Sequence, residues 1–241
     1  MKKKVFLLIT LFVFCVSIPM TAQSRRDLWF VGDGTMATYG ADSTEARGWV
    51  QMLEQYLSPK VKLTNDAKLG ISAKVFMDNQ GMKQLAKQSA RTILFLQLGT
   101  NDLKEYSQAQ YSAPDAFIRR VQEIIAAAYK NKVNVLLCTP LAQPYYKEGV
   151  LIDRLGSYTE MIRHIAAYNH IGLLDLEQTT REWLQGMTEQ EAAKYYVTLD
   201  ENALANGEYQ LNEEGATVVA GMVRDAIVNT NSKKLKKILK K

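Results

Sequence analysis

The stretch TILFLQLGTND, residues 92–102, decides the fold of this chain more than any other segment. Its first part, Thr92 to Leu98, is a nearly continuous apolar run, which is typical of a strand buried on both faces of a parallel sheet. Gly99, Asn101 and Asp102 follow at once and predict a polar turn where the strand ends. A central strand of this kind requires helices that cover both faces of its sheet.

Strands and amphipathic helices alternate on both sides of this segment. The hydrophobic pattern predicts strands at 28–31, 61–64, 92–98, 133–138 and 171–174. It predicts helices from an N-cap at 43–46 to Tyr56, at 73–88 with an interruption at Gly81, from Pro114, at 158–168, within 177–196 and at 212–228. Successive βαβ units have right-handed crossovers. We therefore expect one α/β domain: a three-layer α/β/α sandwich with a mainly parallel five-stranded sheet in the flavodoxin-like order 2-1-3-4-5.

The amino terminus has the pattern of a signal peptide. Basic residues 2–4 precede the apolar run 5–16, which is too short to span a bilayer as an anchor, and small residues follow. We expect cleavage near residues 22–24 and a secreted or periplasmic protein without an integral membrane segment. The expected organisation is a signal peptide at 1–23, a domain at 24–230 and a basic tail at 231–241. Cleavage leaves Cys138 alone, so no intramolecular disulfide forms.

The excess of positive charge belongs to the ends of the chain. The chain has 30 Lys and Arg against 25 Asp and Glu, and lysines are concentrated in the leader and in the tail KKLKKILKK, 233–241. The body between them is mildly acidic, which argues against nucleic-acid binding. Two interpretations of the tail remain: contact with an acidic polysaccharide or a membrane surface, and a solvated, frayed helix end, which termini favour.

Polar turns follow the first three predicted strands. They are GDGT from Gly32, NDAKLGIS from Asn65, and GTND from Gly99. Ligands of open parallel sheets bind beyond the carboxyl ends of the strands, so the three turns predict a site at one edge. Each turn alone is equally typical of a simple chain reversal.

In this order, the turns resemble the conserved blocks of the SGNH (GDSL-type) hydrolases. The branch they resemble most is that of the rhamnogalacturonan acetylesterase-like enzymes, which begin with Gly-Asp-Ser-Thr-Met. Residues 32–36, Gly-Asp-Gly-Thr-Met, match this block except at the serine. Further matches are Asn65, Ala67, Gly70, Ser72, Gly99, Asn101, Asp102, Thr139, Pro140, the segment 149–158, Leu174 to Leu176 and the segment 211–223. The resemblance implies the SGNH hydrolase fold over essentially the whole mature chain.

The same resemblance implies a changed catalytic triad. The family's Ser, Asp and His correspond here to Gly34, Gly207 and Gln210. Glycine offers no nucleophile and glutamine no base, so the resemblance implies no intact catalytic residue. We expect His164 and His170 to be structural or surface residues, because both lie away from the site. Thr35 is an unfavourable substitute for the serine, because a shift of one position on a turn points its side chain elsewhere, and Ser72 lacks a histidine partner. Asp200 and Glu208 could act as bases only through an unusual course of their loop.

The resemblance also implies that an oxyanion hole survives. Its donors are the backbone N–H groups of Gly34 and Gly70 and the side chain of Asn101. The alternative is that tight turns alone require Gly70 and Asn101, and that Gly34 relieves strain in a sharp turn. Asp33, Thr35 and Ser72 are possible cleft contacts, with a capping role as the alternative for Ser72. No metal or cofactor is implied.

Three functions are compatible with these observations. The first is an inactive member of the fold that binds a carbohydrate or acetylated glycan in the old cleft. The second is an active carbohydrate O-acetylesterase with a rearranged catalytic set. The third is a structural or partner-binding module. The sequence does not determine the ligand or the oligomeric state.

Overall fold

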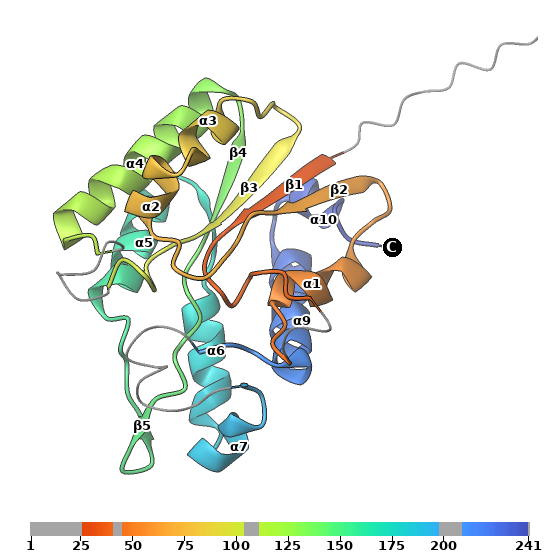
Figure 1. Ribbon diagram of the computed structural model, residues 1–241. Coiled ribbons are helices and arrows are strands. Elements are labelled where there is room, and N and C mark those ends of the chain that lie inside the picture. The colour runs from red at the N-terminus through yellow and green to blue at the C-terminus, as the bar shows by residue number, and fades with distance from the viewer. Residues whose placement is uncertain (1–25, 41–44, 104–110, 198–208, 241) are drawn as a thin grey trace, which may run out of the picture.

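A computed structural model describes residues 26–40, 45–103, 111–197 and 209–240 of the chain. Its centre is a five-stranded parallel sheet in the order β2-β1-β3-β4-β7 (Figure 1). The strands are β1 (Arg26–Val31), β2 (Val61–Asn65), β3 (Thr92–Gln97), β4 (Asn134–Cys138) and β7 (Gly172–Leu174). The predicted architecture and strand order are therefore confirmed.

Two hydrophobic clusters cover the two faces of the sheet, because successive side chains of a strand point to opposite sides. Leu28 and Phe30 belong to one cluster, and Trp29 and Val31 belong to the other. Phe30 stacks on Phe95 of the neighbouring strand with ring centroids 4.4 Å apart. Every residue of β3 is buried, as its apolar run predicts.

The helices form two layers, one on each face (Figure 1). Buried residues of α2, α3, α4 and α5 join one cluster, and those of α1, α6, α7 and α9 join the other. The helices are α1 (Trp49–Leu53), η1 (Glu54–Tyr56), α2 (Ala73–Asp78), α3 (Gly81–Leu85), α4 (Pro114–Lys130), α5 (Ser157–Tyr168), α6 (Leu176–Gln185), α7 (Glu189–Ala193), α9 (Glu213–Asn229) and α10 (Lys233–Lys236). None of the helices in this part of the chain is long and apolar enough to cross a bilayer.

Two helix predictions need correction. The helix expected from an N-cap at 43–46 begins only at Trp49, after Gly48, whose N–H donates to the side chain of Gln51. The helix expected at 73–88 is interrupted as predicted, because Gln80 has the left-handed φ of 67°, but it ends at Leu85.

The carboxyl-terminal tail is not a frayed end, contrary to the favoured interpretation. Ser232 caps α10, and Ile238 is fully buried in the hydrophobic cluster beside α9. The backbone of the tail also pairs with the segment before β2, because Ser58 N–H donates to the carbonyl of Ile238 at 2.7 Å. A small apolar anchor between the lysines thus fixes the tail on the domain.

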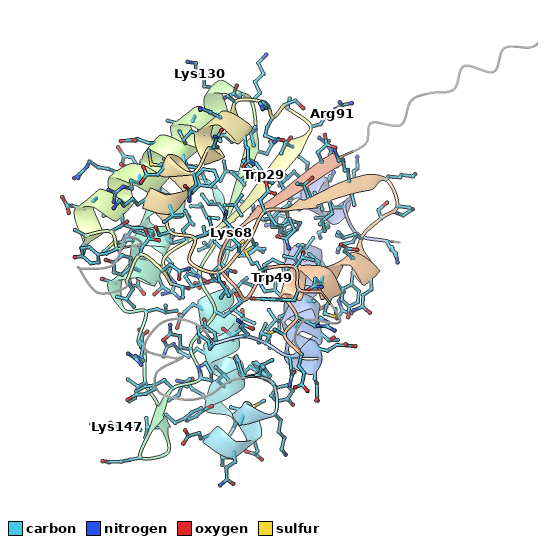
Figure 2. All side chains as sticks on the ribbon, viewed as in Figure 1. Trp29, Trp49, Lys68, Arg91, Lys130 and Lys147 are labelled. Carbon is cyan, nitrogen blue, oxygen red and sulfur yellow. The ribbon has the colours of Figure 1, made fainter. Side chains whose placement is uncertain are left out.

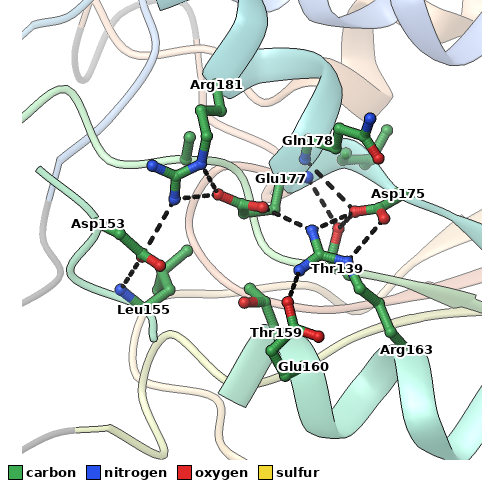
Figure 3. Close-up of polar contacts among 12 residues, drawn as sticks. Thr139, Asp153, Leu155, Thr159, Glu160, Arg163, Asp175, Glu177, Gln178 and Arg181 are labelled. Atoms are coloured by element: carbon green, nitrogen blue, oxygen red, sulfur yellow. Dashed lines mark hydrogen bonds and ion pairs between the residues drawn. The ribbon is translucent and has the colours of Figure 1, made fainter. Parts of the chain in front are cut away.

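A charged network fixes the segments that follow β4 and β7 (Figure 3). Arg163 of α5 forms ion pairs with Asp175 at 2.7 Å and with Glu177 at 2.6 Å. Arg181 pairs with the same Glu177, which is buried, and with Asp153 at 3.2 Å. The network joins α5 and α6 to the loop that follows a hairpin of β5 (Tyr146–Lys147) and β6 (Val150–Leu151). The sequence analysis did not predict this hairpin.

Candidate functional site

The turn after β1 is built around the buried carboxylate of Asp33. Its Oδ1 accepts hydrogen bonds from the backbone and hydroxyl of Thr35, at 2.9 and 2.6 Å, and from Gln97 Nε2 at 3.0 Å. Its Oδ2 accepts from the hydroxyl of Thr100 at 2.7 Å. A buried carboxylate is stable only when its oxygens are paired in this way. Asp33 and Thr35 therefore fix the backbone on which Gly34 lies.

Gly34 lies in a space that other side chains fill. A Cβ atom built on it would lie 2.5 Å from Cδ2 of Leu69 and 3.0 Å from the hydroxyl oxygen of Tyr39. That hydroxyl donates to the carbonyl of Gly34 at 2.8 Å, and burial, followed by the nearby charge of Asp33, raises its pKa well above the ordinary value. The φ of Gly34 is not in the left-handed region, so the alternative that this glycine relieves backbone strain has no support here. Leu69 is 46% exposed, so a serine at this position would require a shift of that side chain and no change of the backbone.

The loop 66–71 connects Gly34 with the turn after β3. Leu69 lies against Gly34, while the carbonyl of Ile71 accepts a hydrogen bond from Asn101 Nδ2 at 2.8 Å. Gly70 has a φ of 77°, which favours glycine. An asparagine amide has two N–H donors, so Asn101 keeps one after this bond.

The backbone N–H groups of Gly34 and Gly70 make no hydrogen bond within the described part of the chain. These two N–H groups and the second hydrogen of the Asn101 amide are therefore not engaged by other described residues. Their common focus on one ligand atom stays a prediction.

Asp102 and Ser72 hold the base of this loop. The carboxylate of Asp102 accepts from the backbone N–H groups of Ala73 at 2.9 Å and Gly99 at 3.1 Å. Burial raises its pKa to about 6, which these hydrogen bonds partly oppose. The hydroxyl of buried Ser72 accepts from Val75 N–H at 3.1 Å and caps α2. The capping role expected as its alternative is confirmed.

A hollow of about 270 Å³ opens beside the loop, at the carboxyl ends of β1 and β2. Its apolar lining comes from Val31, Ile71 and Phe76, which are buried. Its polar lining consists of Asn65, Asp66, Lys68, Asn79 and Gln84. Lys68 comes directly before Leu69, so one loop contributes both to the hollow and to the filled space at Gly34. Lys68 is exposed, and its label lies near the middle of the view in Figure 2.

The remaining predicted positions provide no imidazole near Gly34. Gln210 is half-buried before α9, and its carbonyl accepts from Val197 N–H at 2.9 Å. Gly207 lies outside the described residues, as do Asp200 and Glu208. His164 on α5 is exposed, and so is His170 in the turn before β7. The expectation of surface histidines is confirmed.

Three residues of the site were missed by the sequence analysis. Tyr39 and Leu69 fill the space at Gly34, and Lys68 lines the hollow. Lys68 and Leu69 belong to the predicted turn NDAKLGIS, so the sequence placed them near the site. It did not predict which residues they contact. Tyr39 carried no signal, because a tyrosine after a turn is most often an ordinary packing residue.

Comparison with known families identifies the chain. Residues 30–216 match the model of the GDSL-like Lipase/Acylhydrolase family. The probable rhamnogalacturonan acetylesterase YesY of Bacillus subtilis (strain 168) is 28% identical over 202 residues, which cover 83% of this chain and 91% of YesY. The chain therefore belongs to the GDSL-like Lipase/Acylhydrolase family.

Solved structures show the same fold. Protein YXIM_BACsu of Bacillus subtilis superposes with a TM-score of 0.72 at 22% identity, over 85% of this chain and 56% of that protein, so the chain spans about half of its length. The acetylxylan esterase Axe2 of Geobacillus stearothermophilus superposes with a TM-score of 0.62 at 14% identity, over 84% of this chain and 94% of Axe2. The five-stranded parallel sheet is thus the fold of known esterases of this family.

Proposed function

We propose that this member of the GDSL-like family is an exported protein that has lost hydrolysis and binds a carbohydrate or acetylated glycan at the carboxyl edge of its sheet. One observation carries the proposal. At the position that resembles the family's serine, the chain has Gly34, which offers no nucleophilic atom. The ends of the Leu69 and Tyr39 side chains lie against it and would have to shift to admit a serine.

The hydroxyl groups around Gly34 are poor substitutes for a serine. Thr35 donates its proton to Asp33 at 2.6 Å, and Ser72 caps α2. The hydroxyl of Tyr39 donates to a backbone carbonyl, and burial raises its pKa, which disfavours the nucleophilic anion. A neutral hydroxyl needs an adjacent base that takes its proton, and neither exposed histidine supplies one. The carboxylate of Asp33 lies beside the hydroxyls of Thr35 and Thr100, but it is buried and accepts four hydrogen bonds that hold the turn.

Hydrogen-bond donors remain around Gly34 although the nucleophile is absent. The free N–H groups of Gly34 and Gly70 and the second hydrogen of Asn101 are suited to a carbonyl oxygen, such as that of an acetyl ester. Such donors stabilise a charge that develops in a reaction, but they do not create it. Without a nucleophile they contribute to affinity only.

The hollow beside the loop has the composition of a sugar-binding site. Its apolar floor suits the C–H face of a sugar ring, and polar groups at its rim suit the hydroxyls. The side chains of Lys68, Asn79 and Gln84 form no hydrogen bond or ion pair with other described residues. They are therefore available to a ligand, and the cation of Lys68 favours a sugar that carries a carboxylate.

An active acetylesterase with a rearranged catalytic set is the second candidate. The observation in its favour is the similarity to YesY, whose name describes a probable rhamnogalacturonan acetylesterase. This candidate requires a hydroxyl and a base beside Gly34, and the pairs that the described residues offer there are Thr35 and Thr100 with Asp33. All three side chains are buried, which closes them to a polymeric substrate. Hydrolysis of an acetylated substrate by the purified protein distinguishes the two candidates.

Thermal stability tests the binding itself. A ligand that binds only the folded state stabilises it by RT ln(1 + [L]/Kd), so the melting temperature rises with the ligand concentration. We expect acetylated rhamnogalacturonan oligosaccharides to stabilise the protein, and Lys68→Ala with Gln84→Ala to remove most of the shift. Lys83→Ala, an exposed change on α3 outside the hollow, is the matched control and keeps the shift. No shift with any acetylated or deacetylated oligosaccharide would contradict the proposal.

A further inference from the structure

Positive charge is concentrated at the amino end of the sheet, where the five strands begin. We call this the amino-end surface and define it by the segments 26–27, 58–62, 86–92, 129–134, 168–172 and 228–240. Within these described segments the only carboxylate is Asp27. The cations are Arg26, Lys60, Lys62, Lys87, Arg91, Lys130, Lys132, Lys233, Lys234, Lys236, Lys237 and Lys240.

Hydrogen bonds place the segments of this surface together. Val133 and Ile171 N–H donate to the ends of α4 and α5, which carry the chain to the starts of β4 and β7. The tail pairs with the segment before β2, and Lys234 lines a cavity together with Ile93 and Asn134 at the starts of β3 and β4. Figure 2 shows Arg91 and Lys130 at one end of the molecule and Lys147 at the opposite end.

These cations form no ion pair within the described part of the chain, although Lys240 Nζ donates to the carbonyl of Gln55 at 2.7 Å. The ion pairs found there involve Arg119, Arg163, Arg181 and Arg224, none of which belongs to the amino-end surface. Most of the surface cations are exposed. Helix-dipole stabilisation explains a lysine such as Lys130 in the last turn of α4, but it does not explain cations in the loops before β2 and β3.

Large apolar side chains are exposed among the cations. Tyr129, Tyr168 and Val228 lie near the ends of α4, α5 and α9, and they are 49%, 79% and 49% exposed. Binding of a linear polyanion would require only the cations and would not account for the exposed tyrosines. Tyrosines beside lysines are typical of a protein surface that lies in the headgroup region of a bilayer.

A cavity of about 460 Å³ opens in the same surface, between the edge strand β7 and the ends of α9 and α10. Polar groups of Asn134, Asn229 and Ser232 line it together with Lys234, and Asp175 lies at its far side. Lys234 is half-buried, and this burial, followed by the neighbouring charge of Arg26, lowers its pKa. An anionic headgroup would supply the missing counter-charge.

We propose that the amino-end surface is a docking site for an anionic phospholipid bilayer. Arg26 lies at the start of β1, so the chain enters the fold at this surface. Docking at this end directs the carboxyl edge of the sheet, with Gly34 and the hollow, away from the membrane. The proposal does not depend on the proposed glycan binding.

Vesicle binding tests the proposal with the chain from residue 24 onward. This part includes the fold, because the two hydrophobic clusters begin at Leu28 and Trp29. We expect binding to vesicles of phosphatidylcholine with phosphatidylserine, and none to phosphatidylcholine alone. Since each cation near an anionic surface contributes on the order of 1 kcal/mol, Lys130→Glu with Lys132→Glu should weaken binding at least ~10-fold.

Matched variants separate this surface from net charge. Lys147→Glu with Lys194→Glu makes the same charge change on exposed residues outside the amino-end surface and should leave binding nearly unchanged. Tyr129→Ser with Tyr168→Ser should weaken binding severalfold, whereas Val150→Ser, also exposed, should not. Circular dichroism and thermal melts confirm that each variant is folded.

Three outcomes would overturn the proposal. The first is no binding to phosphatidylserine vesicles by the folded protein. The second is an equal loss in both charge-reversed variants, which would assign binding to net charge. The third is a preference for polygalacturonate with no effect of the tyrosine changes on vesicle binding, which would assign the surface to an acidic polysaccharide.

Discussion

The charged side chains at the two ends of the sheet differ in burial and in pairing. At the carboxyl end, Asp33 and Asp102 are buried and their oxygens are paired with hydroxyl, amide and backbone donors. At the amino end, lysines and arginines are mostly exposed and lack ion-pair partners among the described residues. The buried carboxylates at the carboxyl end fix the backbone of the turns. The exposed cations at the amino end are accessible to an anionic ligand.

This difference has a consequence for function. At the carboxyl end, Gly70 and Asn101 lie in the turns where the sequence places them, whereas Gly34 has no nucleophilic atom. Three predictions probe the comparison of the two ends, in order of decreasing effect.

The largest effect is expected from restoring the triad at the carboxyl end. Gly34→Ser, Gly207→Asp and Gln210→His together with Leu69→Ala should generate esterase activity on aryl acetates. Loss of a serine-hydrolase triad removes on the order of 10⁶ in rate, so a restored one should exceed the unmodified protein by at least ~10³. Leu69→Ala is included because Leu69 occupies the space of the serine side chain.

Two controls sharpen this result. The triple variant that keeps Leu69 should be much less active, and Gly34→Ser alone should do little because no imidazole activates it. Equal activity with and without Leu69→Ala would show that Leu69 does not close the site. An inactive but folded quadruple variant would show that more than the triad and Leu69 has changed.

A carboxylate at each end gives the second prediction. Asp33→Ala removes the acceptor of four hydrogen bonds from a buried turn and should lower the free energy of unfolding by about 3 kcal/mol or more. Asp27→Ala, at the amino end, has no such bonds in the described structure and should change it by about 0.5 kcal/mol or less. Urea unfolding measures both, and equal losses would contradict the contrast.

The smallest changes in the free energy of unfolding are expected from breaking one ion pair that is partly buried and one that is exposed. Asp175→Asn breaks the partly buried pair with Arg163 and should cost about 1–3 kcal/mol at pH 7. Asp225→Asn removes an exposed pair with Arg224 near the end of α9 and should cost about 0.5 kcal/mol or less.

The cost of Asp175→Asn should depend on pH in a defined direction. Arg163 lowers the pKa of Asp175 against the opposing effect of burial, so the folded pKa lies below the unfolded value of about 3.9. Its contribution is present above that value and is lost as the pH falls through the lowered folded pKa. Unfolding curves of parent and variant should converge below about pH 4. A constant difference down to pH 2 would contradict this account.

The sequence was sufficient for the layers of the fold and the order of its strands. Burial on both faces of β3 and the alternation of strands with helices leave few other topologies. The short α1 was placed too early, since Ser43 and Thr44 look like a cap but the helix begins after Gly48. Residue preferences identify possible helix caps, whereas tertiary packing decides at which of them the helix begins.

The site was predicted in outline but not in its contacts. The polar turns at Gly34, Gly70 and Asn101 follow from the periodicity and the resemblance. The filling of the space at Gly34 by Leu69 and Tyr39 does not, because it depends on how two loops about thirty residues apart meet. The tail was misjudged for the same reason, since one buried residue, Ile238, fixes a segment that otherwise consists mostly of lysine.

The central claim, that the chain has lost hydrolysis, is tested most directly by acetate release from acetylated rhamnogalacturonan. The purified, unmodified protein should release no more acetate than the buffer control, at any pH from 5 to 9, because Gly34 provides no nucleophile and Gln210 no base. An identically purified preparation of the restored variant serves as the positive control. Saturable acetate release by the unmodified protein, in proportion to its concentration, would contradict the account.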